Sequence, residues 1–218
     1  MIPKIIHYCW FGPNSLSILN NKCIDSWRRY YPDYEIMLWN ETNSPIDHPY
    51  LKKALLEKKY AFAADFCRFY ALYNYGGLYL DTDMECIQSL DEEILCNDFV
   101  SAYEDLMNRY VSCGFIGAKK NSQICLEMIN YYCDVSFYEN IPLILTRVLK
   151  DTDESFVTYP SHYFYPYNPY DVDQPIKQLM YFQIKADTYA IHHWEKSWNL
   201  SLFDKLRKKY FKLFRRSK

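Results

Sequence analysis

The sequence lacks the features of an exported protein, of a membrane-spanning protein and of a structural zinc protein. Its first residues lead directly into a strand-like run instead of a signal peptide, and its longest apolar runs are shorter than a transmembrane span. None of the eight cysteines forms a Cys-x-x-Cys pair, and no Cys/His spacing matches a zinc site. We therefore expect a cytoplasmic protein whose thiols are reduced and mostly buried.

Positive charge is scarce outside the end of the chain. The sequence has 25 Lys and Arg against 27 Asp and Glu, a net charge of −2. Residues 205–218 hold eight of the basic residues and no acidic residue, so the remainder has 17 basic and 27 acidic residues and a net charge of −10. A body this acidic argues against nucleic acid as a partner.

The basic tail has the pattern of an amphipathic helix. Phe203, Leu206, Tyr210, Leu213 and Phe214 recur at helical spacing among the positive charges. Such a helix can lie on an anionic membrane surface, where each nearby cation contributes about 1 kcal/mol. A solvated terminal helix is the alternative. The first interpretation predicts peripheral contact with the inner face of the cell membrane through residues 203–218.

Internal repeats and low-complexity linkers are also absent, and 218 residues fit one domain. Half of the residues are apolar and 24% are charged, which is typical of a folded domain. Aromatic residues are abundant, with 23 Tyr, 13 Phe and 5 Trp. Such rings serve either as core side chains with a polar tip or as stacking partners for sugars and bases.

Predicted strands alternate with predicted helices along the chain. We expect strands at 2–10, 34–39, 78–80, 98–103, 111–117, 156–160 and 186–193, and helices at 16–30, 50–58, 61–75, 122–134, 141–149 and 200–214. This order predicts an α/β domain with a mainly parallel central sheet. Ligands of such sheets bind beyond the carboxyl ends of the strands.

Asp81 and Asp83 directly follow the predicted strand 78–80. Two carboxylates one residue apart, where a buried strand meets solvent, repel each other, and a divalent cation relieves that repulsion. Hard oxygen ligands suit Mg²⁺ or Mn²⁺, which hold the paired phosphates of a nucleotide-sugar and stabilise a leaving diphosphate. An ordinary acidic turn is the alternative for the pair taken alone.

The preceding helix adds a second charged pair. Asp65 and Arg68 lie three residues apart on one helix face. They either form a local ion pair, or they place Asp65 on ribose or sugar hydroxyls and Arg68 near a diphosphate. Gly76 and Gly77 end the helix, and glycine also allows backbone to pass close to a ligand. The charged pair on the helix, the two glycines and the acidic pair follow one another within one short stretch, and this order favours a nucleotide-sugar site.

The run KKYAFAADFCRFYALYNYGGLYLDTDMEC resembles the DxD sugar-binding region of family 32 glycosyltransferases, which include bacterial capsular polysaccharide transferases and fungal mannosyltransferases. IPKIIHYCWFG, PDYEIMLWNE, YPSHYFYP and IHHWEKSW resemble further segments of that family. For residues 1–200 the resemblance implies a GT-A fold and a retaining hexosyltransferase that needs Mn²⁺ or Mg²⁺. It implies a UDP-sugar donor, with a GDP-sugar as the alternative, and an oligosaccharide or lipid-linked acceptor for capsular or exopolysaccharide synthesis. Residues 201–218 are then an appended basic helix.

The resemblance also implies roles by position. It places Trp10 by the nucleotide base, Asp65 and Arg68 on the donor, Asp81 on the ribose, sugar or metal, and Asp83 on the metal. His192, with His193 as the alternative, supplies a late metal or diphosphate contact, and Ser197 and Trp198 close over the phosphates. Because adjacent strand residues face opposite ways, only one of the two histidines easily reaches the metal.

The sequence departs from the family pattern at two places. Ala64 stands where the family often has Ser, and residues 140–142 replace a turn formed by a small residue, Gly and Pro. The first departure removes one potential hydroxyl contact, and the second leaves the acceptor side undetermined. Glu104 and Asp105 either meet acceptor hydroxyls or form an acidic surface loop, and we favour the loop.

Two rival functions follow from the same residues. A haloacid-dehalogenase-type phosphatase also places DxD after a buried strand, but a Thr or Val normally stands where this chain has Glu85. Asp65 and Arg68 have no role in that scheme. The other rival is a sugar-nucleotide-binding subunit without turnover, against which the intact acidic pair argues. His7 and His162 are interpreted as structural.

Overall fold

The computed structural model describes residues 1–134 and 137–195. Its centre is a six-stranded sheet with the strand order β2-β1-β3-β6-β5-β7. The strands are β1 (Ile5–Cys9), β2 (Glu35–Trp39), β3 (Gly77–Leu80), β5 (Phe99–Ala102), β6 (Phe115–Ala118) and β7 (Phe156–Tyr159). All neighbours pair in parallel except at β6, which runs against both β3 and β5. The predicted α/β fold with a mainly parallel sheet is thus confirmed.

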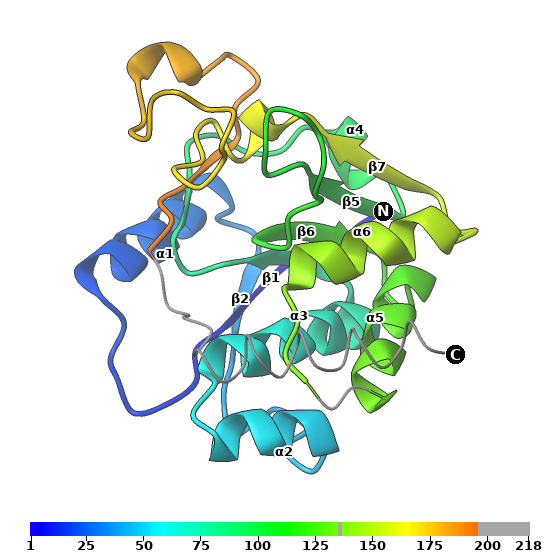
Figure 1. The fold of residues 1–218 in the computed structure, drawn as a ribbon. Helices are drawn as coiled ribbons and strands as arrows, with labels where there is room; N and C mark the ends of the chain where they lie inside the picture. The colour runs from blue at the N-terminus through cyan, green and yellow to red at the C-terminus, as the bar shows by residue number, and fades with distance from the viewer. Residues whose placement is uncertain (135–136, 196–218) are drawn as a thin grey trace.

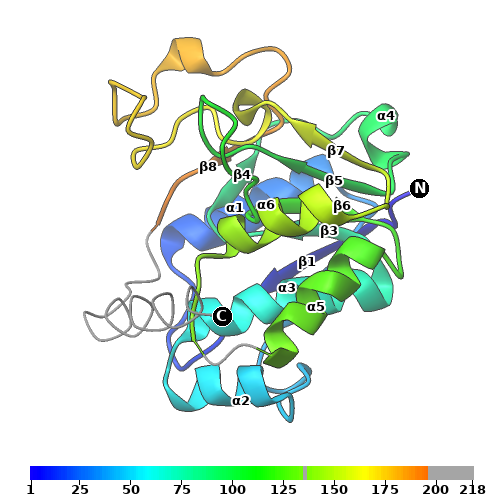
Figure 2. The same cartoon turned by 45° about the vertical axis from the view of Figure 1, so that its right-hand side comes forward.

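Helices cover both faces of this sheet (Figures 1 and 2). They are α1 (Ile18–Tyr30), α2 (Pro49–Leu56), α3 (Tyr60–Tyr75), α4 (Glu92–Leu95), α5 (Gln123–Asp134) and α6 (Ile141–Asp151), with short 3-10 turns at Ser161–Tyr163 and Tyr181–Gln183. Alternate residues of β3 face opposite cores: Tyr79 packs with α2, α3, α5 and α6, whereas Leu78 and Leu80 pack with α1. The central strands are therefore buried on both faces.

A second sheet holds the end of the described chain against the segment after β3. It consists of β4 (Met84–Cys86) and β8 (Ala190–His192), which pair antiparallel with Met84 opposite His192. The sequence predicted neither β4 nor α4, because three- and four-residue elements leave too short a pattern to detect. The register of this pairing brings β8 beside the acidic pair.

The junction between α3 and β3 depends on its two glycines. Gly76 and Gly77 have φ values of +66° and +111°, which side chains with a Cβ rarely adopt. A Cβ on Gly77 would lie 2.6 Å from the carbonyl oxygen of Ile5 in β1, and one on Gly76 would lie 2.6 Å from the backbone nitrogen of Lys120. The close approach is therefore to neighbouring backbone, not to a ligand.

Three further expectations can be compared with the fold. All eight cysteines are free and six of them are buried, as predicted. Strand β6 begins at Phe115 instead of residue 111, because Val111 forms only an isolated bridge with Tyr103 and a bend at residues 113–114 interrupts the strand. In the described part of the chain no helix combines the length and apolarity needed to cross a membrane. The predicted helix 200–214 lies outside the described residues.

Candidate active site

The two acidic residues of the DxD motif stand at the carboxyl end of β3. The backbone nitrogen of Asp81 donates to the Gly114 carbonyl at 2.8 Å, and the Tyr79 hydroxyl donates to its Oδ1 at 3.0 Å. Asp83 is only 7% exposed. Both carboxylates line one cavity, so the repulsion expected from their spacing acts within a single site.

His192 reaches this pair from β8. Its Nε2 lies 3.0 Å from Oδ1 of Asp83, and the backbone nitrogen of Glu195 donates to Oδ2 at 2.8 Å. Burial disfavours the charged form of each partner, but their mutual attraction outweighs it: the pKa of Asp83 is lowered and that of His192 is raised. The end of the described chain therefore folds over Asp83.

The donor set fits a divalent cation. One side-chain ligand atom from each of Asp81, Asp83 and His192 lies within 4.8 Å of the others. In addition, Nδ1 of His192 is buried without a hydrogen-bond partner. Buried polar atoms normally have partners, so the unpaired Nδ1 leaves His192 with a ring nitrogen that can bind a ligand, while Nε2 faces Asp83. Carboxylate oxygens with one imidazole suit Mn²⁺ or Mg²⁺ better than they suit soft metals.

Arg68 supports the acidic pair from α3. Its guanidinium is buried and makes ion pairs with Asp65 at 2.9 Å and Asp81 at 3.2 Å, while Nη1 donates to the Cys113 carbonyl at 2.6 Å. It also stacks over the Tyr79 ring, 4.6 Å from the centroid. Burial raises the pKa of Asp65 to about 7, although the charge of Arg68 opposes that rise. Other protein groups thus hold the Arg68 guanidinium in place. Its ion pair with Asp81 in turn fixes the orientation of the Asp81 carboxylate.

A cavity of about 690 Å³ joins these residues to the first strand of the sheet. Such a volume is in the range that small-molecule sites occupy. The sequence-predicted residues on its wall are Trp10, Asp65, Arg68, Asp81, Asp83 and His192. Ala64 and residues 140–142, where the sequence departs from the family pattern, line the same cavity.

The alternative histidine points elsewhere. Nε2 of His193 lies 2.8 Å from Oε2 of Glu85, and neither residue lines the cavity. Adjacent residues of β8 face opposite sides, as expected for a strand. Ser197 and Trp198, the remaining predicted contacts, lie outside the described residues.

The expectation of an acidic surface loop at Glu104 and Asp105 is wrong. Asp105 is 4% exposed, accepts hydrogen bonds from the backbone nitrogens of Met107 and Tyr110, and pairs with Arg109 at 3.1 Å. Glu104 faces the cavity, and its carboxyl has no hydrogen bond to the described part of the chain. Burial raises the pKa of Glu104 to about 7, which the charge of His192 opposes. The sequence predicted a surface loop for Glu104 and Asp105 because acidic residues after a strand are usually solvated.

Glu195 is a cavity residue that sequence reasoning missed. Its carboxylate accepts hydrogen bonds from Ser17 at 3.2 Å and from Asn20 at 2.8 Å, and it thereby ties the segment after β8 to the start of α1. The only sequence signal was its place in IHHWEKSW. Its neighbour Trp194 has a φ of +58°, a bend that turns the backbone toward Asp83.

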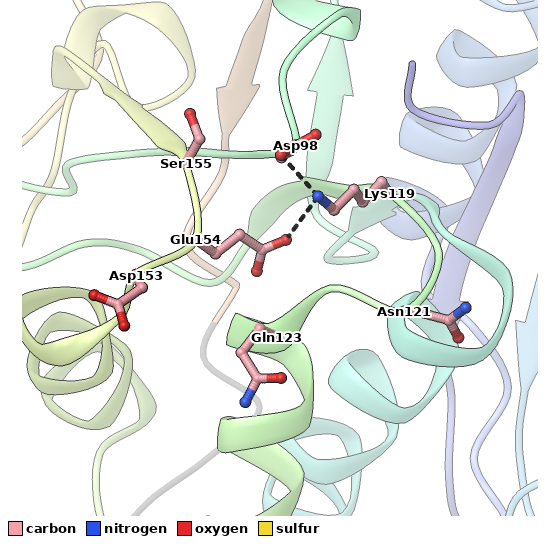
Figure 3. A pocket seen from close by; sticks show the side chains of 7 residues that line it. All are labelled: Asp98, Lys119, Asn121, Gln123, Asp153, Glu154 and Ser155. Atoms are coloured by element: carbon pink, nitrogen blue, oxygen red, sulfur yellow. Dashed lines mark ion pairs between the residues drawn. The ribbon is translucent and has the colours of Figure 1, made fainter.

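A second cavity, of about 420 Å³, lies at the opposite edge of the sheet (Figure 3). There Lys119 follows β6 and pairs with Asp98 at 2.7 Å and with Glu154 at 3.6 Å. Glu154 also accepts from the Ile124 nitrogen at the start of α5. Lys119 and the start of α5 thus bind the carboxylates of Asp98 and Glu154, and we interpret this cavity as a structural feature of the sheet edge.

Comparisons with known proteins agree with this site. Residues 19–100 match the family described as "Glycosyltransferase sugar-binding region containing DXD motif". Inositol phosphoceramide mannosyltransferase 3 of Schizosaccharomyces pombe is 36% identical over 98 residues, which is 41% of this chain and 26% of that protein. An uncharacterized glycosyltransferase of Acanthamoeba polyphaga mimivirus is 29% identical over 134 residues, or 57% of this chain and 53% of the relative. The chain thus spans about a quarter to a half of the length of these relatives.

Solved glycosyltransferase structures share the fold. The PaToxG glycosyltransferase superposes with a TM-score of 0.53 and 20% identity over 68% of this chain and 69% of its own. A glycosyltransferase involved in glycosylation of the major capsid of PBCV-1 gives a TM-score of 0.52 and 10% identity over 87% of this chain and 93% of its own. These likenesses show a GT-A fold.

The matched motif and the fold are both those of glycosyltransferases. Over residues 19–100, the family match confirms the resemblance that the sequence motifs indicated. In this chain, residues 19–100 therefore match the glycosyltransferase sugar-binding region that contains the DXD motif, and they are set within a GT-A fold.

Proposed function

We propose that this chain transfers a hexose from a nucleoside-diphosphate sugar to a carbohydrate or lipid-linked acceptor, with retention of anomeric configuration. The observation that carries the proposal is the convergence of Asp81, Asp83 and His192 on one cavity wall. That cavity extends to Trp10, so one elongated ligand can touch both ends. We take a UDP-sugar as the donor, with a GDP-sugar as the alternative.

Each residue has a defined task in this scheme. When bound by Asp81, Asp83 and His192, a Mn²⁺ or Mg²⁺ ion supplies Lewis-acid stabilisation of the departing diphosphate. Arg68 keeps Asp81 oriented, and Asp65 binds a hydroxyl of the ribose or sugar. Trp10 lies beside the base. Ser197 and Trp198 close over the phosphates in this proposal.

Glu104 is our candidate for the acceptor side. It follows β5, faces the cavity and has a carboxyl that is free to bond a ligand hydroxyl. A cavity-facing carboxyl with a pKa of about 7 accepts a hydrogen bond from an incoming hydroxyl when ionised and donates one when protonated. Residues 140–142 stand nearby on the cavity wall and shape the space for the acceptor.

A lipid-bearing acceptor is supported by the names of the relatives. Two of them are inositol phosphoceramide mannosyltransferases of Schizosaccharomyces pombe, which makes a mannosyl donor and a lipid acceptor worth testing first. A lipid-linked unit of a capsular or exopolysaccharide fits the same chemistry. Either acceptor would bring the enzyme to a membrane, and we propose that residues 203–218 provide peripheral contact there.

A panel of sugar nucleotides incubated with Mn²⁺ tests the proposed function. Release of UDP or GDP should be measurable for at least one donor and should fall by at least about a hundredfold in Asp83→Asn, because the metal loses a carboxylate. Glu85→Gln is the matched control, since Glu85 lies two residues away but pairs with His193 outside the cavity. It should retain the release rate.

Three outcomes would contradict the proposal. Full activity of Asp83→Asn would remove the role of this carboxylate at the metal. Hydrolysis of simple phosphate esters, without donor cleavage, would favour a phosphatase. Binding of UDP with Mn²⁺ but no hydrolysis or transfer would favour a binding subunit.

A further inference from the structure

The short segment after β8 is bound to Asp83 at two points. The backbone nitrogen of Glu195 donates to Oδ2 of Asp83 at 2.8 Å, and the backbone nitrogen of His193 donates to the Asp83 carbonyl at 3.0 Å. The Asp83 carboxylate therefore has Oδ1 against the His192 ring and Oδ2 against the backbone of this segment. Its orientation depends on where the segment lies.

The carboxylate of Glu195 fixes this segment to the start of α1. It accepts hydrogen bonds from the Ser17 hydroxyl at 3.2 Å and from the Asn20 amide at 2.8 Å. Glu195 is exposed, but Asn20 is only 1% exposed, so a surface carboxylate is bound by a buried donor. The dipole of this 13-residue helix also favours a negative charge at its amino terminus.

The two donors on α1 are themselves held in place. Ser17 caps the helix by accepting from the Asn20 nitrogen at 3.1 Å, and Oδ1 of Asn20 accepts from the Ser17 nitrogen at 3.0 Å. Because the amide oxygen of Asn20 is used in this capping box, its NH₂ group is the part that faces Glu195. The start of α1 is thus a prepared binding point for a carboxylate.

The same helix supports the chain on the other side of Asp83. The ring nitrogen of Trp27 donates to the carbonyl of Met84, the residue after Asp83, at 2.7 Å. The Cys86 nitrogen donates to the Ser26 hydroxyl at 2.9 Å. Helix α1 therefore holds both β4, which follows Asp83, and the segment that bonds its carboxylate.

The position of Glu195 argues for an indirect role at the metal site. Among the described residues, the side chains close enough to share a cation are those of Asp81, Asp83 and His192, and Glu195 is not one of them. Its carboxylate is turned onto α1, whereas its backbone nitrogen is the group that meets Asp83.

We propose that Glu195 is a positioning residue for the metal site. By binding the start of α1, its side chain holds its own backbone nitrogen on Asp83 and so orients that carboxylate toward the cation. The inference deepens the proposed function, since it rests on the proposed metal site. Breaking the contact with α1 should lower the affinity for the metal while every metal ligand stays in the chain.

Mn²⁺ binding to the full-length chain, followed by electron paramagnetic resonance, tests this inference. The titration is made without nucleotide, because Asn20 also lines the cavity, and at pH 8 to keep the carboxyls ionised. Asn20→Asp retains an oxygen for the Ser17 nitrogen but sets a carboxylate against Glu195. We expect the affinity for Mn²⁺ to fall at least about tenfold, the lower end of the effect of removing groups that support metal ligands.

Asn21→Asp is the matched control. It adds the same charge at the next residue of α1, which is exposed and does not line the cavity. Its affinity for Mn²⁺ should equal that of the unaltered chain. Because an added negative charge by itself attracts a cation, weaker binding in Asn20→Asp alone would point to the lost contact and not to the charge.

The double variant Asn20→Asp/Glu195→Gln gives a readout that a general loss of stability would not produce. It exchanges donor and acceptor, so the amide at position 195 can donate to the carboxylate at position 20 and Mn²⁺ affinity should recover. Glu195→Ala, at an exposed position, should weaken binding as Asn20→Asp does. Unaltered affinity in Asn20→Asp or in Glu195→Ala would overturn the inference, and so would a double variant that does not recover.

Nucleotide release separates this inference from the proposed function. If the unaltered chain releases no UDP or GDP from any donor, the proposed function fails, while the Mn²⁺ titrations still decide the role of Glu195. If it releases the nucleotide and its Mn²⁺ affinity does not depend on the contact with α1, only the inference fails. An unaltered chain that binds no Mn²⁺ would also overturn the inference.

Discussion

At the scale of single residues, the site depends on which side of a strand each polar group faces. His192 and His193 are neighbours, yet one lies 3.0 Å from Asp83 and the other lies 2.8 Å from Glu85. These two acid–histidine pairs have similar geometry, and only the first of them lines the cavity. Substitutions in the pair of His193 and Glu85 can therefore serve as controls for substitutions in the pair of His192 and Asp83.

This pairing gives a prediction for the two histidines. His192→Gln should raise the Mn²⁺ concentration for half-maximal nucleotide release by at least about tenfold, the lower end of the effect of removing groups that support a metal. His193→Gln should change it little. A titration of activity with Mn²⁺ measures both. An equal effect of the two substitutions would mean that His192 supports the fold and does not bind the metal.

Glu104 gives a second prediction at this scale. If its carboxyl faces the acceptor, Glu104→Gln should raise the KM for the acceptor, whereas donor hydrolysis without acceptor should stay near the unaltered rate. Rates of transfer and of hydrolysis, measured on the same preparation, separate the two effects. A parallel loss of both would place Glu104 on the donor or the metal.

At the scale of elements, the junction of α3 with β3 decides where the DxD motif emerges. His7 in β1 is fully buried, and Trp39 of β2 donates to its Nδ1 at 3.1 Å. Nε2 must therefore carry the proton and donate to the Gly76 carbonyl at 2.8 Å. The ring thus links two strands to the turn after α3, which confirms that His7 is structural.

His7 makes stability depend on pH. Burial lowers its pKa from 6.5 to about 4, although the bond to Gly76 acts in the opposite direction. Between these values the unfolded chain binds more protons than the folded one, so this contribution is complete above pH 6.5 and is lost as pH falls toward 4. At pH 5 the loss should be about 2 kcal/mol.

Urea unfolding at pH 7 and pH 5 checks this prediction. His7→Gln can keep both hydrogen bonds but does not titrate, so the fall in unfolding free energy between the two pH values should be smaller in the variant by about that amount. Identical pH dependence of both proteins would show that protonation of His7 is not coupled to folding.

At the scale of the whole molecule, the cavity is assembled from distant parts of the chain. Its wall includes the segment after β1, the amino-terminal part of α3, the DxD turn, the end of β5 and the residues around β8. The basic residues of 203–218 lie outside the described residues.

Removal of residues 203–218 tests the proposed membrane contact. The shortened chain should bind vesicles containing phosphatidylglycerol more weakly, and the remaining binding should depend less on salt because eight cations are lost. Sedimentation at low and high salt measures this effect. Unchanged binding would mean that the tail is a solvated terminus.

The sequence by itself determined the order of the elements and the place of the acidic pair. Helical and alternating patterns are local, so α3, its terminal glycines and the short strand before Asp81 could be predicted from consecutive residues. The mainly parallel sheet followed from the alternation of these elements. The resemblance supplied the family, because its motif is contiguous.

Only the tertiary structure decided what lies beside that motif. The antiparallel pairing of β4 with β8 sets Met84 opposite His192, and this register selects His192 over His193 at the cavity. It also decided that Glu104 faces the cavity and that Glu195 binds α1. A register, and the burial it causes, depends on contacts between residues far apart in the chain, which no local pattern encodes.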